Sequence, residues 1–296
     1  MSGADPGLGL ERTLATAEGR LEVATRAAEF AEQAGQGLLE HFERLEATQV
    51  RSKDVARDLV TEADLASERH LVRCLREAYP TTAIEAEEEV RDEAGPGLRW
   101  FLDPLDGTVN FVHGLPCFAV SVALYRDREP LAGCVHLPRL GETFLGAQGA
   151  GAFLGSRRLQ ISRTDDLGQA VLATGFPYRR GELPNDNLGN AARLVRPVRG
   201  LRRMGSAAVD LAYTAAGRLD GYWELHLAPH DVAAGALLIL EAGGVVQDLR
   251  GGQDWLRGGS VVAGPGELVR KLAERTTDAP DPFPVGEFPS DQGAEA

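Results

Sequence analysis

The sequence predicts a mixed α/β protein, and three observations support this fold class. Apolar residues recur at helical spacing through Ala78, short runs of β-branched and aromatic residues dominate the middle of the chain, and strand-like and helix-like segments alternate in the second half. Of the 296 residues, 43% are hydrophobic and 25% are charged, which are ordinary values for globular proteins. The composition therefore excludes wholesale disorder and a collagen-like or coiled-coil rod.

Two helices are expected before any strand. Apolar residues recur at three- and four-residue steps from Thr13 to Ala47, and again from Ala63 to Ala78, where Tyr79-Pro80 ends the pattern. The first twelve residues contain Gly and Pro without periodicity. We therefore expect residues 1–12 to be a flexible N-terminus.

Strand-like segments follow the two helices. Each is short, rich in apolar residues and bounded by turn-forming residues. They cover Arg99–Leu102, Phe118–Tyr125, Leu131–His136, Glu142–Ala147 and Gly151–Leu154. With the helices before them, these strands predict an N-terminal α+β portion over residues 13–156.

The second half of the chain alternates between strand and helix patterns. Strands are expected near Ala170–Thr174 and Val198–Arg203, and helices near Asn187–Val195, Ala207–Arg218 and Asp231–Ala242. Such alternation is typical of α/β structure, so residues 157–275 are predicted to form a C-terminal α/β portion. Residues 276–296 hold four prolines and five acids with no basic residue, which predicts a disordered tail.

The net charge of −13 limits the classes of binding partner. An acidic chain is a poor binder of nucleic acid but is suited to gathering divalent cations. No apolar run reaches the roughly 18 residues of a membrane-spanning helix, and the first residues lack the pattern of a secretory signal. Three cysteines without metal-type spacing fit a reducing compartment. We therefore expect a cytoplasmic protein that binds neither membranes nor nucleic acid directly.

The stretch WFLDPLDGTVNFVHGLP, Trp100–Pro116, contains the most informative motif. A strand that ends here places the carboxylates of Asp103 and Asp106 on one side of a turn, where Gly107 permits a close backbone approach. Clustered carboxylates repel each other and need cations, and hard oxygen ligands favour Mg²⁺ or Mn²⁺. Thr108 adds a hydroxyl beside backbone amides that are suited to an anion. In isolation, however, such a turn is more often a capping turn with solvated aspartates.

Further charged residues lie on either side of this motif. Lys53, the segment DLVTEAD (Asp58–Asp64) and the pair Glu87-Glu88 precede it, and Asp231 follows at the start of an apolar helix. Each has an ordinary structural interpretation when it is taken alone, because a carboxylate at a helix N-terminus is most often a cap. Only their joint order and spacing favour a site.

Taken together, these segments resemble the inositol monophosphatase family of magnesium-dependent, lithium-sensitive phosphatases. The resemblance runs from about Lys53 to Asp248, and its third part is most similar to the bacterial inositol-1-monophosphatase branch. It implies a five-layer α/β/α/β/α sandwich and a homodimer. The matching segments are DLVTEAD with Glu87-Glu88, WFLDPLDGTVNFVHGLPCFAVSVAL, and RRMGSAAVDLAYTAAGRLDGYWE followed by PHDVAAGALLILEAGG.

The resemblance also implies a role for each matched residue. A first Mg²⁺ would be held by Glu87, Asp103 and the carbonyl of Leu105, and a second by Asp103, Asp106 and Asp231. A third, weaker ion would use Glu87 with Asp64 nearby, and Mn²⁺ would substitute for Mg²⁺. The implied catalytic residues are Glu87, Thr108 and Asp106. The implied substrate-binding residues are Gly107, Thr108, Gly205, Ser206, Ala207, Glu224, Asp231 and Lys53.

The chain departs from the family pattern at three places. His230 stands where the family has Trp, which puts the substrate preference and the lithium sensitivity in doubt. Glu85 stands where an apolar strand residue is expected. The family's Gly-Glu-Glu-Ser reads Ala86-Glu87-Glu88-Glu89 here, so a register in which Glu88 replaces Glu87 as the ligand stays open.

The leading hypothesis is a Mg²⁺-dependent phosphomonoesterase that hydrolyses a small polyol phosphate, myo-inositol 1-phosphate first of all, by metal-activated water. The nearest alternative is a fructose-1,6-bisphosphatase or another small sugar-phosphate phosphatase. A second alternative from a different class is a regulatory role through a protein partner.

Overall fold

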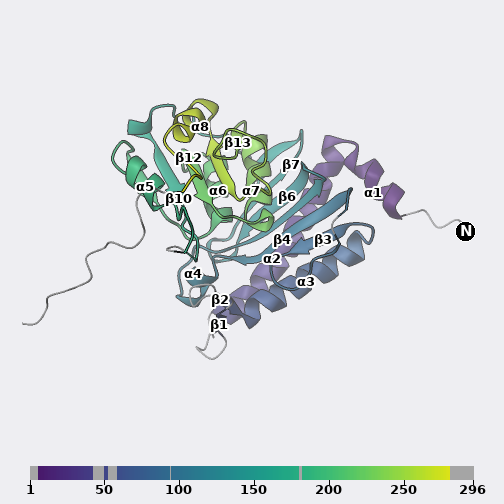
Figure 1. The fold of residues 1–296 in the computed structure, drawn as a ribbon. Coiled ribbons are helices and arrows are strands. Elements are labelled where there is room, and N and C mark those ends of the chain that lie inside the picture. Colours follow the sequence, from purple (N-terminus) through teal and green to yellow (C-terminus); the bar gives the residue numbers. More distant parts are fainter. Residues whose placement is uncertain (1–5, 43–49, 53–58, 94, 180–181, 281–296) are drawn as a thin grey trace, which may run out of the picture.

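The computed structural model describes residues 6–42, 50–52, 59–93, 95–179 and 182–280. Its elements form two large sheets with helices outside and between them (Figure 1), together with a two-stranded sheet. Among the described residues, no helix is long and apolar enough to cross a lipid bilayer.

The first sheet has seven strands in the order β3-β4-β5-β6-β7-β8-β9, and only the β3–β4 pair is parallel. β5 is buried along nearly its whole length, which requires cover on both faces of the sheet. The strands are β3 (Ala83–Ala86), β4 (Leu98–Asp106), β5 (Ala119–Arg126), β6 (Glu129–Leu137), β7 (Glu142–Ala147), β8 (Gly151–Leu154) and β9 (Arg157–Arg158).

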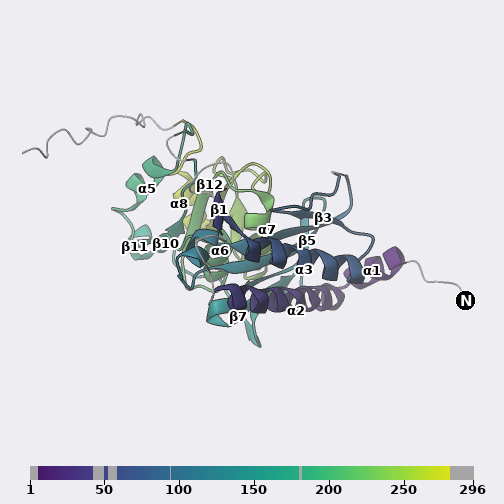
Figure 2. The same cartoon turned by 90° about the horizontal axis from the view of Figure 1, so that it is seen from below.

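Helices α2 (Ala17–Phe42) and α3 (Glu62–Ala78) cover the outer face of this sheet (Figure 2). They confirm the two predicted helices within the described residues. The expected flexible N-terminus is corrected, because Pro6–Leu14 forms helix α1. Leu10 and Leu14 are buried, so packing against α2 stabilises a helix despite its glycines. Residues 1–5 lie outside the described residues.

The second sheet has five strands in the order β11-β10-β12-β14-β13. Trp223 and Tyr222 are its largest fully buried side chains, and they lie on opposite faces. The sequence analysis predicted β10 and β11 and missed β12, β13 and β14. The strands are β10 (Val171–Thr174), β11 (Gly200–Arg202), β12 (Gly221–Leu225), β13 (Val245–Gln247) and β14 (Ser260–Gly264).

Helices α6 (Ala207–Ala215) and α7 (Pro229–Glu241) lie between the two sheets, while α5 (Leu188–Leu194) and α8 (Gly266–Ala273) cover the outer face of the second. The central helices pack closely, since a Cβ on Gly235 would lie 2.4 Å from Cβ of Leu211. Helix, sheet, helix, sheet and helix thus make five layers, which confirms the expected sandwich. The remaining pair of strands, β1 (Val50–Ser52) and β2 (Leu59–Thr61), is antiparallel.

The start of the C-terminal segment corrects the expectation of a disordered tail over residues 276–296. Asn185 Nδ2 donates to the carbonyl oxygens of Thr277 and Ala279 at 2.8 and 2.7 Å, and Asn190 Nδ2 donates to that of Thr277 at 3.0 Å. Both asparagines are buried, so residues 276–280 satisfy polar groups of the fold. Residues 281–296 lie outside the described residues.

Truncation experiments should separate these two parts of the tail. Removing residues 276–296 is expected to destabilise the protein by about 2–4 kcal/mol, because it leaves the buried amide group of Asn185 without an acceptor and removes one acceptor of Asn190. Removing only residues 281–296 preserves these bonds and should change stability little. Urea unfolding of the two truncated chains tests this, and equal midpoints would contradict it.

Candidate active site

The carboxylates of Asp103 and Asp106 lie at the end of β4. The pairing with β5 is irregular between these two residues, and the backbone N–H of Leu105 donates to Asp103 Oδ1 at 3.0 Å. Gly107 follows with a φ of +94°, and a Cβ there would lie 2.9 Å from the carbonyl oxygen of Cys117. Only glycine therefore fits the turn that joins β4 to α4 (Thr108–Val112).

Asp64 is held in place by the start of α3. The N–H and the hydroxyl of Thr61 donate to Asp64 Oδ2 at 2.8 and 2.5 Å, which completes a capping box. The hydroxyl of Thr108 lies 3.1 Å from both Asp64 Oδ1 and the carbonyl oxygen of Leu105. Through these two contacts the Thr108 hydroxyl connects the start of α3 to the end of β4.

The segment after β3 is positioned by the buried carboxylate of Glu68. Its oxygens accept the backbone N–H groups of Glu88, Glu89 and Val90, each at 2.8 Å. We call this arrangement the Glu68 clamp. It leaves Glu87 beside Asp103, with whose carboxyl it shares a hydrogen bond. Of the two registers that the sequence left open, the geometry therefore favours Glu87.

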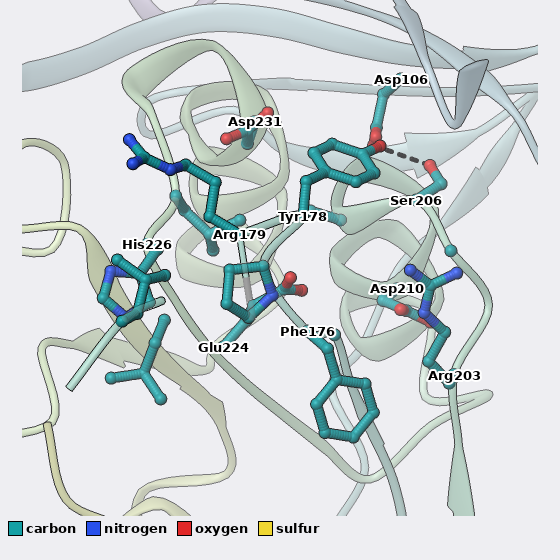
Figure 3. A pocket seen from close by; sticks show the side chains of 17 residues that line it. Asp106, Phe176, Tyr178, Arg179, Arg203, Ser206, Asp210, Glu224, His226 and Asp231 are labelled. Carbon is teal, nitrogen blue, oxygen red and sulfur yellow. Dashed lines mark hydrogen bonds between the residues drawn. The ribbon is translucent and has the colours of Figure 1, made fainter. Parts of the chain in front are cut away.

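Asp106 and Asp231 bring the C-terminal half into the same place. Asp106 Oδ2 accepts from the hydroxyl of Ser206 at 2.7 Å and from the N–H of Ala208 at 2.6 Å, at the N-terminus of α6 (Figure 3). Asp231 lies in the first turn of α7, where its Oδ2 accepts the N–H of Ala228 at 2.6 Å. Residues from both halves thus build one group of acids.

We call Asp64, Glu87, Asp103, Asp106 and Asp231 the acidic cluster. Burial, followed by the charges of Glu87, Asp106 and Asp231, raises the pKa of Asp103 well above its ordinary value. Burial and the charge of Asp231 raise the pKa of Asp106 to about 7, and burial raises that of Asp64 to about 6. The carboxyls therefore resist being charged together without a cation.

The donor set suits a hard divalent cation, because it consists of carboxylate oxygens and the nearby carbonyl of Leu105. Within the described ranges, no three His, Cys, Asp or Glu side chains form a ready-made metal-coordination group. The fit therefore rests on the chemistry of the acidic cluster and on its mutual repulsion, which a bound cation would relieve.

The raised pKa values predict how the stability of the metal-free protein depends on pH. A carboxyl with a higher pKa in the folded than in the unfolded state stabilises the fold while it is protonated. For Asp106 this stabilisation is complete below about pH 4 and is lost as the pH rises through about 7. We expect the free energy of unfolding to fall by a few kcal/mol over this range in EDTA. Added Mg²⁺ should remove most of this slope, and a flat profile in EDTA would contradict the prediction.

A cavity of about 310 Å³ opens beside Asp106 and Asp231, and Glu224 of β12 lies in its wall (Figure 3). The hydroxyl of Tyr222 donates to the Glu224 carboxyl, and burial raises the pKa of Glu224 to about 8. A Cβ on Gly175 would lie 2.1 Å from the carboxyl oxygens of Glu224, so glycine makes room for this group.

The predicted substrate-lining stretch Gly205–Ala207 also borders this cavity. Gly205 has a φ of +86°, and Ser206 is the N-cap of α6. His230 is buried beside the cluster, with Nε2 3.7 Å from Asp231 Oδ1. Glu85, the other unusual residue, forms an ion pair with Arg257 at 2.7 Å. Lys53 lies outside the described residues.

Sequence reasoning missed part of the cavity wall. The segment Phe176–Arg179 after β10, His226 after β12 and Asp210 of α6 also line it. The position of Asp210 could have been inferred from the sequence, because it follows the N-cap Ser206 by one helical turn and therefore lies near the end of α6 that borders the cavity. An acid in the first turn of a helix is usually attributed to the helix dipole, so Asp210 was not considered as a residue of the site.

The model of the inositol monophosphatase family matches residues 20–280. The chain belongs to the inositol monophosphatase family. Membership supports phosphatase activity, and the family is generally metal-dependent. The resemblance that the motifs indicated is therefore confirmed at the level of the family.

Relatives of this family member carry two kinds of name. This chain is 46% identical to the Nus factor SuhB of Pseudomonas aeruginosa over 258 aligned residues, and the alignment covers 85% of this chain and 93% of that protein. This chain is 42% identical to the inositol-1-monophosphatase of Mesorhizobium japonicum over 240 aligned residues, and the alignment covers 81% of this chain and 90% of that protein. The extragenic suppressor protein SuhB of Bartonella henselae has a solved structure with a TM-score of 0.80 and 38% identity, covering 86% of this chain and 98% of that one.

Proposed function

We propose that this protein is a Mg²⁺-dependent phosphomonoesterase that acts on a small polyol phosphate, with myo-inositol 1-phosphate as the preferred substrate. The observation that carries the proposal is the acidic cluster, whose members come from both halves of the chain and two of which, Asp106 and Asp231, line one cavity. Buried carboxyls that raise one another's pKa destabilise a metal-free fold, and a cation-dependent function accounts for their presence.

The acidic cluster supplies the ligands in this proposal. Glu87, Asp103 and the Leu105 carbonyl would hold one Mg²⁺, and Asp103, Asp106 and Asp231 a second, with Asp64 near a third. When bound, the ions supply a lowered pKa for the attacking water and stabilisation of the leaving oxygen. Backbone and hydroxyl donors orient the carboxylates before any ligand arrives, as with the two hydrogen bonds to Asp106.

The remaining polar groups would bind and orient the substrate. The Thr108 hydroxyl lies between Asp64 and the Leu105 carbonyl, within the cluster, where with Glu87 it would orient a water molecule. Backbone N–H groups at Gly107 and Thr108 would face the phosphate. Glu224 and the Gly205–Ala207 stretch border the cavity on the side where the polyol hydroxyls would lie.

Phosphate release from a substrate panel tests the proposal. Inositol 1-phosphate, fructose 1,6-bisphosphate, histidinol phosphate and adenosine 3′,5′-bisphosphate would each be incubated with the protein in Mg²⁺ and in EDTA. We expect Mg²⁺-dependent release that is fastest for inositol 1-phosphate. Preference for another member would overturn the proposed substrate, and no release from any member would overturn the activity.

A regulatory role through a protein partner is the second candidate function. The Nus-factor name of relatives such as the Pseudomonas aeruginosa protein supports it. Replacing Asp106 by Asn separates the two functions, because it removes a proposed metal ligand while Ser206 and Ala208 keep an oxygen acceptor. A cellular phenotype that survives the loss of phosphatase activity in this variant would support the partner role, and one lost with the activity would count against it.

A further inference from the structure

Asp210 has a buried carboxyl oxygen that lacks a partner. The side chain is 1% exposed, and its Oδ1 makes no hydrogen bond with any residue that the structure describes. Most buried polar atoms in folded proteins are hydrogen-bonded, so this oxygen requires a specific explanation. Asp210 also lines the cavity beside Asp106 and Glu224 (Figure 3).

The surroundings of Asp210 do not account for this oxygen by themselves. A backbone hydrogen bond from Met204 reaches the carboxyl, and the positive charge of Arg203 also favours its charged form. Arg203 is exposed, and no ion pair joins it to Asp210 among the described residues. The helix dipole of α6 is an insufficient reason, because a dipole partner can remain in water whereas this group is buried.

The position of Glu224 points to the chemistry that would satisfy Asp210. Both residues line the same cavity, and within the described part of the chain neither carboxyl forms an ion pair, although the charge of Arg203 acts on both. Two neighbouring carboxyls of this kind suit neutral groups that donate hydrogen bonds, and a polyol presents such groups on adjacent carbons.

We propose that Asp210 is a specificity-determining residue whose Oδ1 binds a hydroxyl of the leaving group, next to the hydroxyl bound by Glu224. The preferred ligand then carries neighbouring hydroxyls on the carbon skeleton attached to the phosphate. This inference rests on the proposed phosphomonoesterase function and adds a second hydroxyl contact to it.

The variant Asp210→Asn tests the proposal with little change of shape. The Met204 N–H needs an acceptor, so the new amide oxygen is expected to face it and the NH₂ group to take the place of Oδ1. The oxygen that we propose to accept the substrate's hydrogen bond thus becomes a donor. The measured quantity is kcat/KM for inositol 1-phosphate divided by kcat/KM for p-nitrophenyl phosphate, whose leaving group has no neighbouring hydroxyls. We expect this ratio to fall about tenfold to a hundredfold.

Asp186→Asn is the matched control, because Asp186 is also a buried aspartate but does not line the cavity. Its Oδ1 accepts the N–H of Leu188 at 3.1 Å, a role that Asn can also fill. The ratio should stay within about twofold of wild type in this control. Thermal unfolding checks that both variants fold, and Asp210→Ser replaces Asp210→Asn if the latter does not.

The outcomes distinguish this inference from the proposed function. A wild-type protein that releases no phosphate from inositol 1-phosphate overturns both. If the wild-type protein is active, an unchanged ratio in the folded Asp210 variant overturns the inference alone. An equal loss on the two substrates also overturns it, because a purely structural role would affect both leaving groups alike.

Discussion

Replacing Asp103 by Asn is expected to reduce Mg²⁺-dependent phosphate release by about 10³-fold or more and, at the same time, to stabilise the metal-free protein. Asp103 is 1% exposed, and Glu87, Asp106 and Asp231 all raise its pKa. A neutral amide removes this repulsion but is a weaker ligand for a hard cation. Metal ions contribute several kcal/mol to such reactions, which corresponds to the expected loss of rate.

Thermal unfolding with and without Mg²⁺ measures both parts of this prediction. The wild-type midpoint should rise on adding Mg²⁺, since a ligand that binds only the folded state stabilises it. The Asp103→Asn midpoint should start higher in EDTA and respond less to Mg²⁺. Asp166→Asn is the control, because Asp166 is an exposed cap whose role Asn fills. A variant less stable than wild type in EDTA would contradict the argument from repulsion.

Replacing Gly107 by Ala is expected to lower kcat/KM by about 10²-fold and to destabilise the fold by about 3 kcal/mol. The positive φ of +94° costs a residue with a Cβ about 1–2 kcal/mol, and contact with the Cys117 carbonyl oxygen at 2.9 Å adds to this. Because Gly107 lies between Asp106 and Thr108, a shift of the turn moves both side chains. A misplacement of about 1 Å is enough to cause a loss of this size.

Gly114→Ala provides the matched comparison for Gly107→Ala. Gly114 has a φ of +70° at the other end of α4, but a Cβ there would meet nothing within 4 Å. This variant therefore measures the cost of the backbone conformation alone. We expect it to lose about 1–2 kcal/mol in urea unfolding and to keep most of its activity. Equal losses of activity in the two variants would show that crowding at Gly107 is unimportant.

The sequence predicted the parts of the site that are local in the chain. Asp103, Asp106 and Gly107 lie within one turn, so residue types and spacing indicated their proximity. The choice between Glu87 and Glu88 was different, because it depends on the buried carboxylate of Glu68, which binds amides about twenty residues away. No spacing rule identifies that partner before α3 and β3 are placed side by side.

The remaining errors have a similar origin in contacts between distant segments. The tail composition predicts disorder, yet Thr277 is held by Asn185 and Asn190, which are about ninety residues away. α1 is stabilised by packing on α2 that overrides weak helix propensity. Asp210 has the local sequence of a first-turn acid, and only the fold shows that its carboxyl is buried at a cavity.

The residues of the Glu68 clamp all precede α6 and α7 in the chain, so they leave the ribosome before these helices do. α3, the segment after β3 and the β4 turn can therefore assemble before α6 and α7 have been translated. Such a nascent chain already holds four of the five acids, but it lacks Asp231 and the Ser206 and Ala208 donors that bind Asp106. Incomplete or prematurely terminated chains are thus unable to complete the acidic cluster, which is assembled only after α7 has been synthesised.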